Sequence, residues 1–250
     1  MKRILFLLLI LLVETLSAQR IQWSNSKDAY YRIEGGEIFI YELPSNQKTV
    51  LADKSILTPK NETEPIAPKS IVLSKSENQL LIFTNTQKVW RYETRGDYWV
   101  FNLKTKTLKK LGKNRPVASL MFAKFSPDEK HVAYVSDRNI YIENLSTGTI
   151  RALTQTGSNK KLINGTFDWA YEEEFDCRDG FRWSPDGKSI AFWQIDATDI
   201  KYFNMINNTD DIYSQTIPIE YPKVGEKPSK CRVGVVNIFT GKQTWLNIPG

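Results

Sequence analysis

Three consecutive glutamates, Glu172, Glu173 and Glu174, are the residues of this 250-residue chain whose type and spacing point most directly to chemistry. They follow Asp168, and aromatic residues stand on both sides of them in the sequence. Two carboxylates held about 4 Å apart repel each other by roughly 4 kcal/mol at an effective dielectric constant near 20. If two of these side chains converge in a cleft, each would favour an arriving ammonium group by a similar amount. The triplet therefore predicts a site for a cation, and the free amino terminus of a peptide fits it.

The triplet also has an interpretation without a ligand. Carboxylates are common on solvated helix faces, and the helix dipole stabilises them in the first turn of a helix. Three glutamates taken alone favour this simpler interpretation. The choice between the two depends on the elements that surround and position the triplet.

A first repeat consists of alternating aromatic and β-branched residues, a short polar turn and a second short strand. Its four copies begin at residues 37, 97, 139 and 232, and each predicts a β-hairpin. The long interval before the last copy predicts an insertion.

A second repeat lies between these hairpins and consists of a strand, a Ser-Pro-Asp turn and another strand. It occurs at residues 125–134 and 183–192, with a degenerate copy at 73–82. Proline supplies the fixed φ of a turn, and Asp or Gly tolerates the positions that follow. Four-stranded units that recur every 40 to 60 residues are typical of β-propeller blades. The single histidine, His131, begins such a strand, so we expect it to be structural.

The amino terminus has the three parts of a secretory signal. Lys2 and Arg3 precede an apolar run over residues 4–13, and small residues end at Ala18, where we expect cleavage. This assigns residues 1–18 to a signal peptide and residues 19–250 to one partial propeller domain. Ten apolar residues are too few to cross a bilayer of about 30 Å, so we expect an exported chain, periplasmic or secreted, without a membrane anchor.

The number of residues after the signal peptide limits how many blades the propeller can have. At roughly 50 residues per blade, the chain suffices for four to five blades, and it ends just after a hairpin. We therefore predict an all-β, incomplete β-propeller. Its open strand edges predict poor solubility without a partner.

The amino-acid composition limits the kinds of ligand and partner that the chain is expected to bind. The chain is 41% hydrophobic and 25% charged, as expected for a globular protein with a core. Its formal net charge is +6, but the basic residues are scattered, which favours a solvated surface over a nucleic-acid site. One histidine and two cysteines cannot build a usual zinc site, and we expect neither metal nor cofactor. Cys177 and Cys231 could form one disulfide in an oxidising compartment or remain separate thiols.

Four motifs together resemble the amino-terminal propeller region of dipeptidyl peptidase IV family serine peptidases. Residues 168–174 resemble the family's Asp-Trp-x-Tyr-Glu-Glu-Glu element, and Trp-Ser-Pro-Asp-Gly follows at residues 183–187. Residues 221–225 resemble its Tyr-Pro-Lys-x-Gly segment, and Trp-Arg-Tyr at residues 90–92 resembles a strand that carries a substrate-contacting arginine. The resemblance is strong from residue 90 to residue 241 and diffuse before that.

The resemblance implies a specific division of roles. In that family an eight-bladed propeller covers an α/β-hydrolase domain, and a short helical insertion directs its last two glutamates into the enclosed cavity. Glu173 and Glu174 would then bind the protonated amino group of a peptide, while Glu172 supports the segment. Arg91 would donate hydrogen bonds to the carbonyl of the first peptide bond, although an arginine on a strand is usually a surface residue. Relatives release amino-terminal dipeptides and prefer proline or alanine as the second residue, because anchoring the amine fixes the distance to the nucleophile.

The chain departs from the family in one large respect. It has no Gly-x-Ser-x-Gly nucleophile motif and no set of residues for a Ser-Asp-His triad, so we assign no catalytic residue and predict an inactive chain by itself. A hydrolase domain would be encoded elsewhere, or lost. The sequence therefore predicts the propeller part of an exported dipeptidyl peptidase IV-like enzyme that recognises substrate amino termini. The alternative is a non-catalytic peptide- or protein-binding propeller fragment, and a scaffold-type propeller would leave the acidic triplet unexplained.

Overall fold

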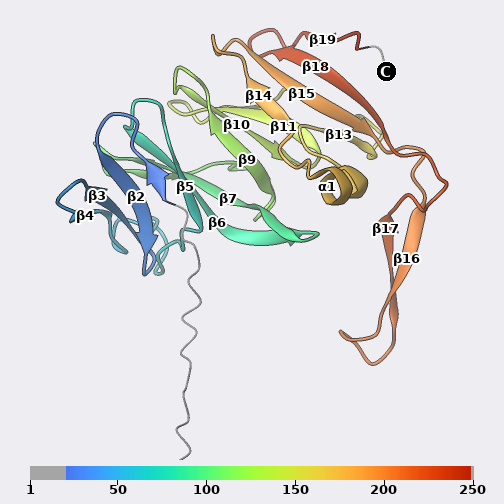
Figure 1. The fold of residues 1–250 in the computed structure, drawn as a ribbon, viewed down its shortest axis with the longest axis horizontal. Helices are drawn as coiled ribbons and strands as arrows, with labels where there is room; N and C mark the ends of the chain where they lie inside the picture. The colour runs from blue at the N-terminus through green and yellow to red at the C-terminus, as the bar shows by residue number, and fades with distance from the viewer. Residues whose placement is uncertain (1–20, 249–250) are drawn as a thin grey trace, which may run out of the picture.

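The computed structural model describes residues 21–248, so the predicted signal peptide lies outside the described residues. Nineteen strands and one short helix make up this part of the chain, and the strands form antiparallel meanders that follow one another along the sequence (Figure 1). The fold is all-β, as the alternating sequence patterns predict. No sheet closes on itself within residues 21–248.

The first sheet is a four-stranded meander. Its strands pair in chain order, namely β1 (Gln22–Trp23), β2 (Ala29–Glu34), β3 (Glu37–Glu42) and β4 (Gln47–Ala52). The hairpin predicted from residue 37 consists of β3 and β4.

The second sheet has eight strands, which divide into two meanders. The first meander contains β5 (Ser70–Leu73), β6 (Gln79–Val89), β7 (Tyr92–Asn102) and β8 (Leu108–Lys110). The second contains β9 (Leu120–Phe125), β10 (His131–Ser136), β11 (Asn139–Asn144) and β12 (Ile150–Ala152). They join where β7 pairs with β9, and the hairpins predicted from residues 97 and 139 are β7–β8 and β11–β12. The strands β6 and β7 have 11 residues each, so the tip of their hairpin extends beyond the meander (Figure 1).

The third sheet has five strands, and two other elements lie between them in the sequence. Its strands are β13 (Leu162–Asn164), β14 (Phe181–Trp183), β15 (Ser189–Asp196), β18 (Lys230–Asn237) and β19 (Gln243–Trp245). The helix α1 (Trp169–Phe175) lies between β13 and β14, and a separate hairpin of β16 (Tyr202–Asn207) and β17 (Gln215–Glu220) lies between β15 and β18. In Figure 1 the β16–β17 hairpin projects away from the sheets. The last predicted hairpin is β18–β19, and the long interval before it contains α1 and the β16–β17 hairpin.

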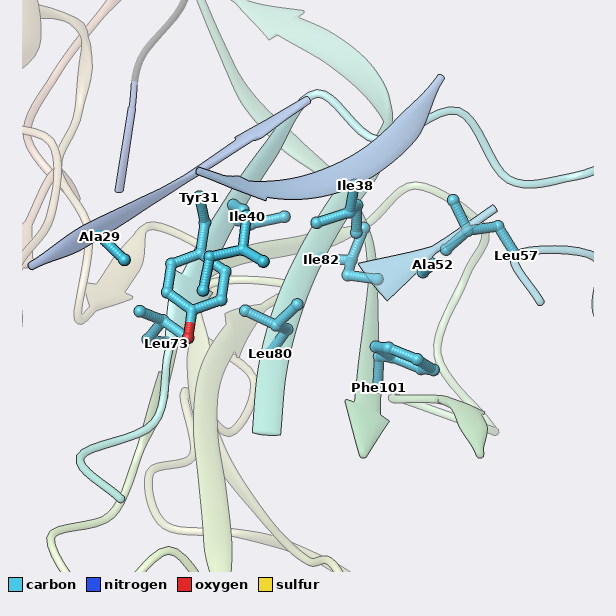
Figure 2. Packing of buried hydrophobic residues seen from close by; sticks show 11 residues of the cluster. Ala29, Tyr31, Ile38, Ile40, Ala52, Leu57, Leu73, Leu80, Ile82 and Phe101 are labelled. Atoms are coloured by element: carbon cyan, nitrogen blue, oxygen red, sulfur yellow. The ribbon is translucent and has the colours of Figure 1, made fainter. Parts of the chain in front are cut away.

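The core consists of apolar clusters between successive meanders. In Figure 2, Tyr31 and Ile38 of the first sheet lie against Leu80, Ile82 and Phe101 of β6 and β7. Two similar clusters join the two halves of the second sheet and join that sheet to the third. Each fully buried side chain of this kind contributes about 1.5–3 kcal/mol relative to an exposed one. This face-to-face packing of meanders is how propeller blades bury their surfaces.

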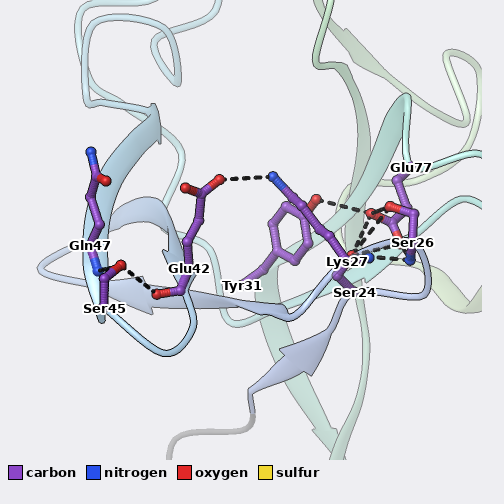
Figure 3. Close-up of polar contacts among 8 residues, drawn as sticks. All are labelled: Ser24, Ser26, Lys27, Tyr31, Glu42, Ser45, Gln47 and Glu77. Atoms are coloured by element: carbon purple, nitrogen blue, oxygen red, sulfur yellow. Dashed lines mark hydrogen bonds and ion pairs between the residues drawn. The ribbon is translucent and has the colours of Figure 1, made fainter.

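The turns of the second repeat also link neighbouring meanders. Glu77, in the turn before β6, has a φ of 57°, and its carboxylate accepts hydrogen bonds from side chains and backbone N–H groups of residues 24–26 (Figure 3). Glu129, at the same place before β10, has a φ of 59° and accepts a hydrogen bond from Ser76 Oγ at 2.5 Å. Gly187 occupies this position before β15, with a φ of 69°. The repeated turn requires a left-handed residue, and in two of these copies the residue is a glutamate that reaches the preceding meander.

Candidate functional site

The acidic triplet lies in α1, and residues at both ends of the helix explain its limits. Asp168 is the N-cap, with an extended backbone, and its Oδ1 accepts a hydrogen bond from the backbone N–H of Tyr171 at 3.1 Å. Such a cap satisfies a donor that has no partner inside the helix. At the other end Asp176 adopts a left-handed conformation with a φ of 57°, and the N–H of Cys177 binds the carbonyl of Tyr171 at 3.0 Å. A left-handed residue at this position ends a helix.

The start of α1 is attached to a segment about 60 residues later in the chain. Ser229 Oγ donates a hydrogen bond to Asp168 Oδ2, and Tyr171 donates its hydroxyl to the Ser229 carbonyl at 3.2 Å. The ring of Trp169 packs on Tyr221, with centroids 4.3 Å apart. The Asp-Trp-x-Tyr and Tyr-Pro-Lys-x-Gly motifs are therefore in direct contact, and together they orient the helix.

The three glutamates have different environments. Glu172 is buried, with 2% of its surface exposed, and the side chain of Glu173 is only 5% exposed. Glu174 is exposed. Arg91, at the tip of the β6–β7 hairpin, forms a close ion pair between its Nε and Glu173 Oε2. The structure thus brings together two of the residues that the sequence selects, Arg91 and Glu173, with Glu174 next to them on the helix.

Arg178, which none of the sequence motifs singles out, provides a cation for Glu172. Its Nε lies 3.8 Å from Glu172 Oε1, and its guanidinium carbon lies 3.6 Å from the centre of the Tyr92 ring. Burial raises the pKa of Glu172 to about 7, and the charge of Glu173 adds to this, while Arg178 opposes it. A basic residue so soon after three carboxylates was the available signal for this pair.

A cleft of about 870 Å3 lies beside the helix. Its wall comes from the β6–β7 hairpin, residues 116–119, the start of α1 and the ends of the β16–β17 hairpin. An ion pair between Arg138 Nη1 and Glu220 Oε2, 3.7 Å apart, connects the β10–β11 turn with β17 in this wall. The volume is in the range of sites that bind small molecules or short peptides.

The residues that the sequence predicts for recognition lie at the margin of this cleft. Trp90 and Trp169 belong to its wall, whereas in the described part of the chain Arg91, Glu173 and Glu174 do not. Each of these three is close in sequence to a wall residue. The site of the ion pair and the cleft are therefore adjacent surfaces, joined by the hairpin tip and the helix.

The two cysteines lie close to α1 in the sequence in one case and on β18 in the other. In the structure Cys177 and Cys231 are both free thiols. The Sγ of Cys177 lies 3.4 Å from the Phe175 carbonyl, and Cys231 is exposed on β18. Residues 21–248 contain no group of three or more His, Cys, Asp or Glu side chains suited to a metal ion. Nor does this part of the chain have a helix with the length and apolar composition to cross a membrane.

Known proteins are similar to this chain over more residues than the four motifs cover. The family model of the dipeptidyl peptidase IV N-terminal region matches residues 74–250, a longer stretch than the motifs alone indicate. Dipeptidyl aminopeptidase B of Saccharomyces cerevisiae is 35% identical over 177 residues, which cover 69% of this chain and 21% of the relative. Prolyl endopeptidase FAP of Mus musculus is 27% identical over 217 residues, or 86% of this chain and 27% of the relative. The chain thus spans about a fifth to a quarter of the length of these relatives.

A solved structure shares the fold. The crystal structure of Porphyromonas gingivalis dipeptidyl peptidase 4 matches with a TM-score of 0.82 and 24% identity, over 92% of this chain and 33% of that one. A putative dipeptidyl aminopeptidase IV from Bacteroides ovatus matches with a TM-score of 0.61 and 18% identity. The family match covers most of the chain, and the fold agrees with it. The chain belongs to the dipeptidyl peptidase IV family, to whose N-terminal region it corresponds.

Proposed function

We propose that this chain is the propeller part of an exported dipeptidyl peptidase IV-like serine peptidase and that it recognises the free amino terminus of the substrate. The observation that carries this proposal is the Arg91–Glu173 ion pair beside the exposed Glu174. Residues from the β6–β7 hairpin and from α1, far apart in sequence, meet there at the margin of a cleft. Proteolysis itself requires a hydrolase domain in addition to the propeller.

Glu173 supplies an acceptor for the amine. Its Oε2 binds Arg91, while its Oε1 is buried and has no hydrogen-bond partner. A buried carboxylate oxygen without a partner is costly, and a charged donor would remove that cost. An ammonium group has three donors, so it can bind Glu173 and Glu174 together.

Arg91 supplies donors for the peptide. Its side chain is 78% exposed, so its terminal nitrogens can reach a ligand while Nε holds Glu173. A guanidinium presents its donors in a fixed plane, which suits the carbonyl of the first peptide bond. The arrangement supports peptides as substrates, and we extend to this chain the preference for proline or alanine as the second residue.

The four meanders are consistent with part of a propeller ring that does not close. Four successive meanders lie within residues 21–248, and we infer a ring segment of four to five blades with α1 as an insertion that carries the glutamates. Export rests on the predicted signal peptide at residues 1–18. These features fit one part of a larger enzyme.

The second candidate is a non-catalytic propeller that binds peptides or proteins. It is favoured by the β16–β17 hairpin, which exposes Phe203, Met205, Ile206 and Ile217. Exposed apolar side chains that lie close together are typical of protein-binding surfaces. In this case the amine site would bind peptides without subsequent cleavage.

Calorimetric titration of the purified chain with the dipeptide Ala-Pro tests the proposal. We expect Glu174→Gln to weaken binding about tenfold or more, because a hydrogen bond to a charged group contributes about 1.5–3 kcal/mol. N-acetylated Ala-Pro, which lacks the charged amine, should bind no better to the wild type than to this variant. Glu64→Gln, at an exposed glutamate in the loop between β4 and β5, is the matched control. Equal binding of the free and the acetylated dipeptide would refute an amine site.

A further inference from the structure

Two neighbouring residues at the tip of the β6–β7 hairpin contact the α1 segment. Arg91 pairs with Glu173, and the next residue, Tyr92, lies under the guanidinium of Arg178 at 3.6 Å. Arg178 in turn lies 3.8 Å from Glu172. The hairpin tip is therefore joined to the helix by two parallel sets of contacts, one through Arg91 and one through Tyr92 and Arg178.

Arg178 is held firmly in this position. Its side chain is 20% exposed, its Nη2 pairs with Asp176 Oδ1, and Thr166 donates its hydroxyl to the Arg178 carbonyl at 3.0 Å. Its Nε and the facing Oε1 of Glu172 are both buried and make no hydrogen bond to another group. The charge of Glu172 therefore depends on Arg178, because without the arginine Glu172 would be buried without a counter-charge, whereas Arg178 also pairs with Asp176.

The chemistry of this contact is specific to arginine. A planar guanidinium can stack on an aromatic ring and face a carboxylate with its edge, whereas the ammonium of lysine is a compact point charge. Tyr92 is 46% exposed, so Arg178 covers the face of a ring at the surface. A cation in this place holds Glu172 and the hairpin tip at the same time.

We propose that Arg178 is a positioning residue of the amine site: by facing Glu172 and stacking on Tyr92, it fixes the helix that carries Glu173 and Glu174 relative to the hairpin that carries Arg91. This inference rests on the proposed function. Arg178 itself need not touch the substrate. Its effect on binding is transmitted through the ionisation of Glu172 and through the geometry of the Arg91–Glu173 pair.

The charged groups around Glu172 predict how the affinity for a dipeptide depends on pH. They are Glu173 on the helix and Arg178 after it, while Arg91 of the hairpin tip pairs with Glu173. Since the pKa of Glu172 is about 7 with Arg178 present, loss of the arginine should move it higher. Ionised Glu172 adds negative charge beside Glu173, so affinity for a dipeptide ammonium should rise through neutral pH in the wild type. An α-amino group has a pKa near 7.7–8.0, so the ligand stays mostly protonated up to about pH 7.5.

The experiment measures the Kd of Ala-Pro by calorimetry between pH 5.5 and 7.5. For Arg178→Met we expect about tenfold weaker binding at pH 7.5 and loss of the rise with pH. Arg178→Lys should restore the rise in part but not the full affinity, because it keeps the charge and loses the stack. Arg182→Met, which removes an exposed arginine four residues later, is the matched control and should leave the profile unchanged.

A double-mutant cycle separates the positioning role from a general loss of structure. In a Glu172→Gln background, Arg178→Met should cost much less affinity than in the wild type, since the buried charge of Glu172 that Arg178 balances is already gone. Tyr92→Leu is a second, independent test, because it removes the ring on which Arg178 stacks and leaves the charges of Arg178 and Glu172. It should weaken binding of Ala-Pro several-fold. An unchanged pH profile in Arg178→Met, or additive effects in the cycle, would overturn the inference. If Glu174→Gln binds Ala-Pro as tightly as the wild type, the proposed function itself fails. If Glu174→Gln binds poorly while Arg178→Met and Tyr92→Leu bind as tightly as the wild type, only the role of Arg178 is refuted.

Discussion

Ser229 donates a hydrogen bond to the carboxylate of Asp168, 61 residues earlier in the chain, and the same carboxylate caps α1 through the N–H of Tyr171. One side chain therefore both starts the helix and attaches it to the segment before β18. Ser229 and Asp168 are both buried, so their hydrogen bond lies largely away from solvent. The orientation of the glutamates on α1 depends on this shared carboxylate.

The first prediction concerns that carboxylate. We expect Asp168→Ala to lower the free energy of unfolding by about 2 kcal/mol, because it removes an N-cap and a hydrogen bond to a charged group. Asp168→Asn should cost less, because asparagine is also a good cap. Urea denaturation measures both values. If the alanine and asparagine variants are equally stable, the cap is not what stabilises the helix.

The second prediction concerns the turn of Glu77. Its φ of 57° is unfavourable for a residue with a Cβ, and its carboxylate binds residues 24–26 of the preceding meander. Glu77→Ala loses the contacts and keeps the strain, whereas Glu77→Gly loses the contacts and relieves the strain. We expect both to destabilise the chain, with glycine milder by about 1 kcal/mol. The order of the two urea midpoints is the test, and a more stable alanine variant would contradict it.

The third prediction is the pH dependence caused by Glu172. Burial raises its pKa to about 7 in the folded chain, above the ordinary value of 4.5. Between these values the folded state binds more protons than the unfolded state, so stability falls as the pH rises from about 4.5 to 7. The loss attributable to this group is at most about 3 kcal/mol. Unfolding free energies across this window should fall less steeply in Glu172→Gln, and identical slopes in the two proteins would rule out the contribution.

The fourth prediction concerns Lys124 on β9, which pairs with Asp179 at 2.6 Å in the loop that follows α1. Burial lowers the pKa of Lys124 to about 8, although Asp179 opposes the shift. Because the unfolded chain then binds more protons between about pH 8 and 10.5, this lysine should make stability rise with pH in that interval, by about 2 kcal/mol after allowing for partial exposure. Thermal unfolding at pH 8 and 9.5 should show that rise reduced in Lys124→Met. A variant that keeps the full rise would exclude Lys124 as its source.

Local patterns were sufficient to predict the hairpins. At residues 139–153, for example, alternating apolar residues and a Ser-Thr-Gly turn favour one local structure, and β11 and β12 form there. The same holds for the turns of the second repeat, because Pro, Asp and Gly restrict the backbone within a few residues. The acidic triplet and the family were also recognisable from residues close together in the chain.

Contacts between distant residues could not be predicted from such patterns. The ion pair of Arg91 with Glu173 and the stack of Arg178 on Tyr92 join segments about 80 residues apart, and each depends on how the β6–β7 hairpin extends past its meander. Two cysteines in one sequence permit a bridge, but only their positions in space show whether it forms, and here both are free.

The sequence by itself determined the strands and turns of the two repeats, the family and the identity of the candidate recognition residues, because propensity, turn chemistry and motif residues are all read over short stretches of chain. Only the tertiary structure decided that Glu172 is buried against Arg178, that Glu173 is held by Arg91 and that Glu174 remains exposed. Three identical side chains in a row differ in this way because each points from the helix in a different direction, and what each one meets is set by the packing of the surrounding meanders.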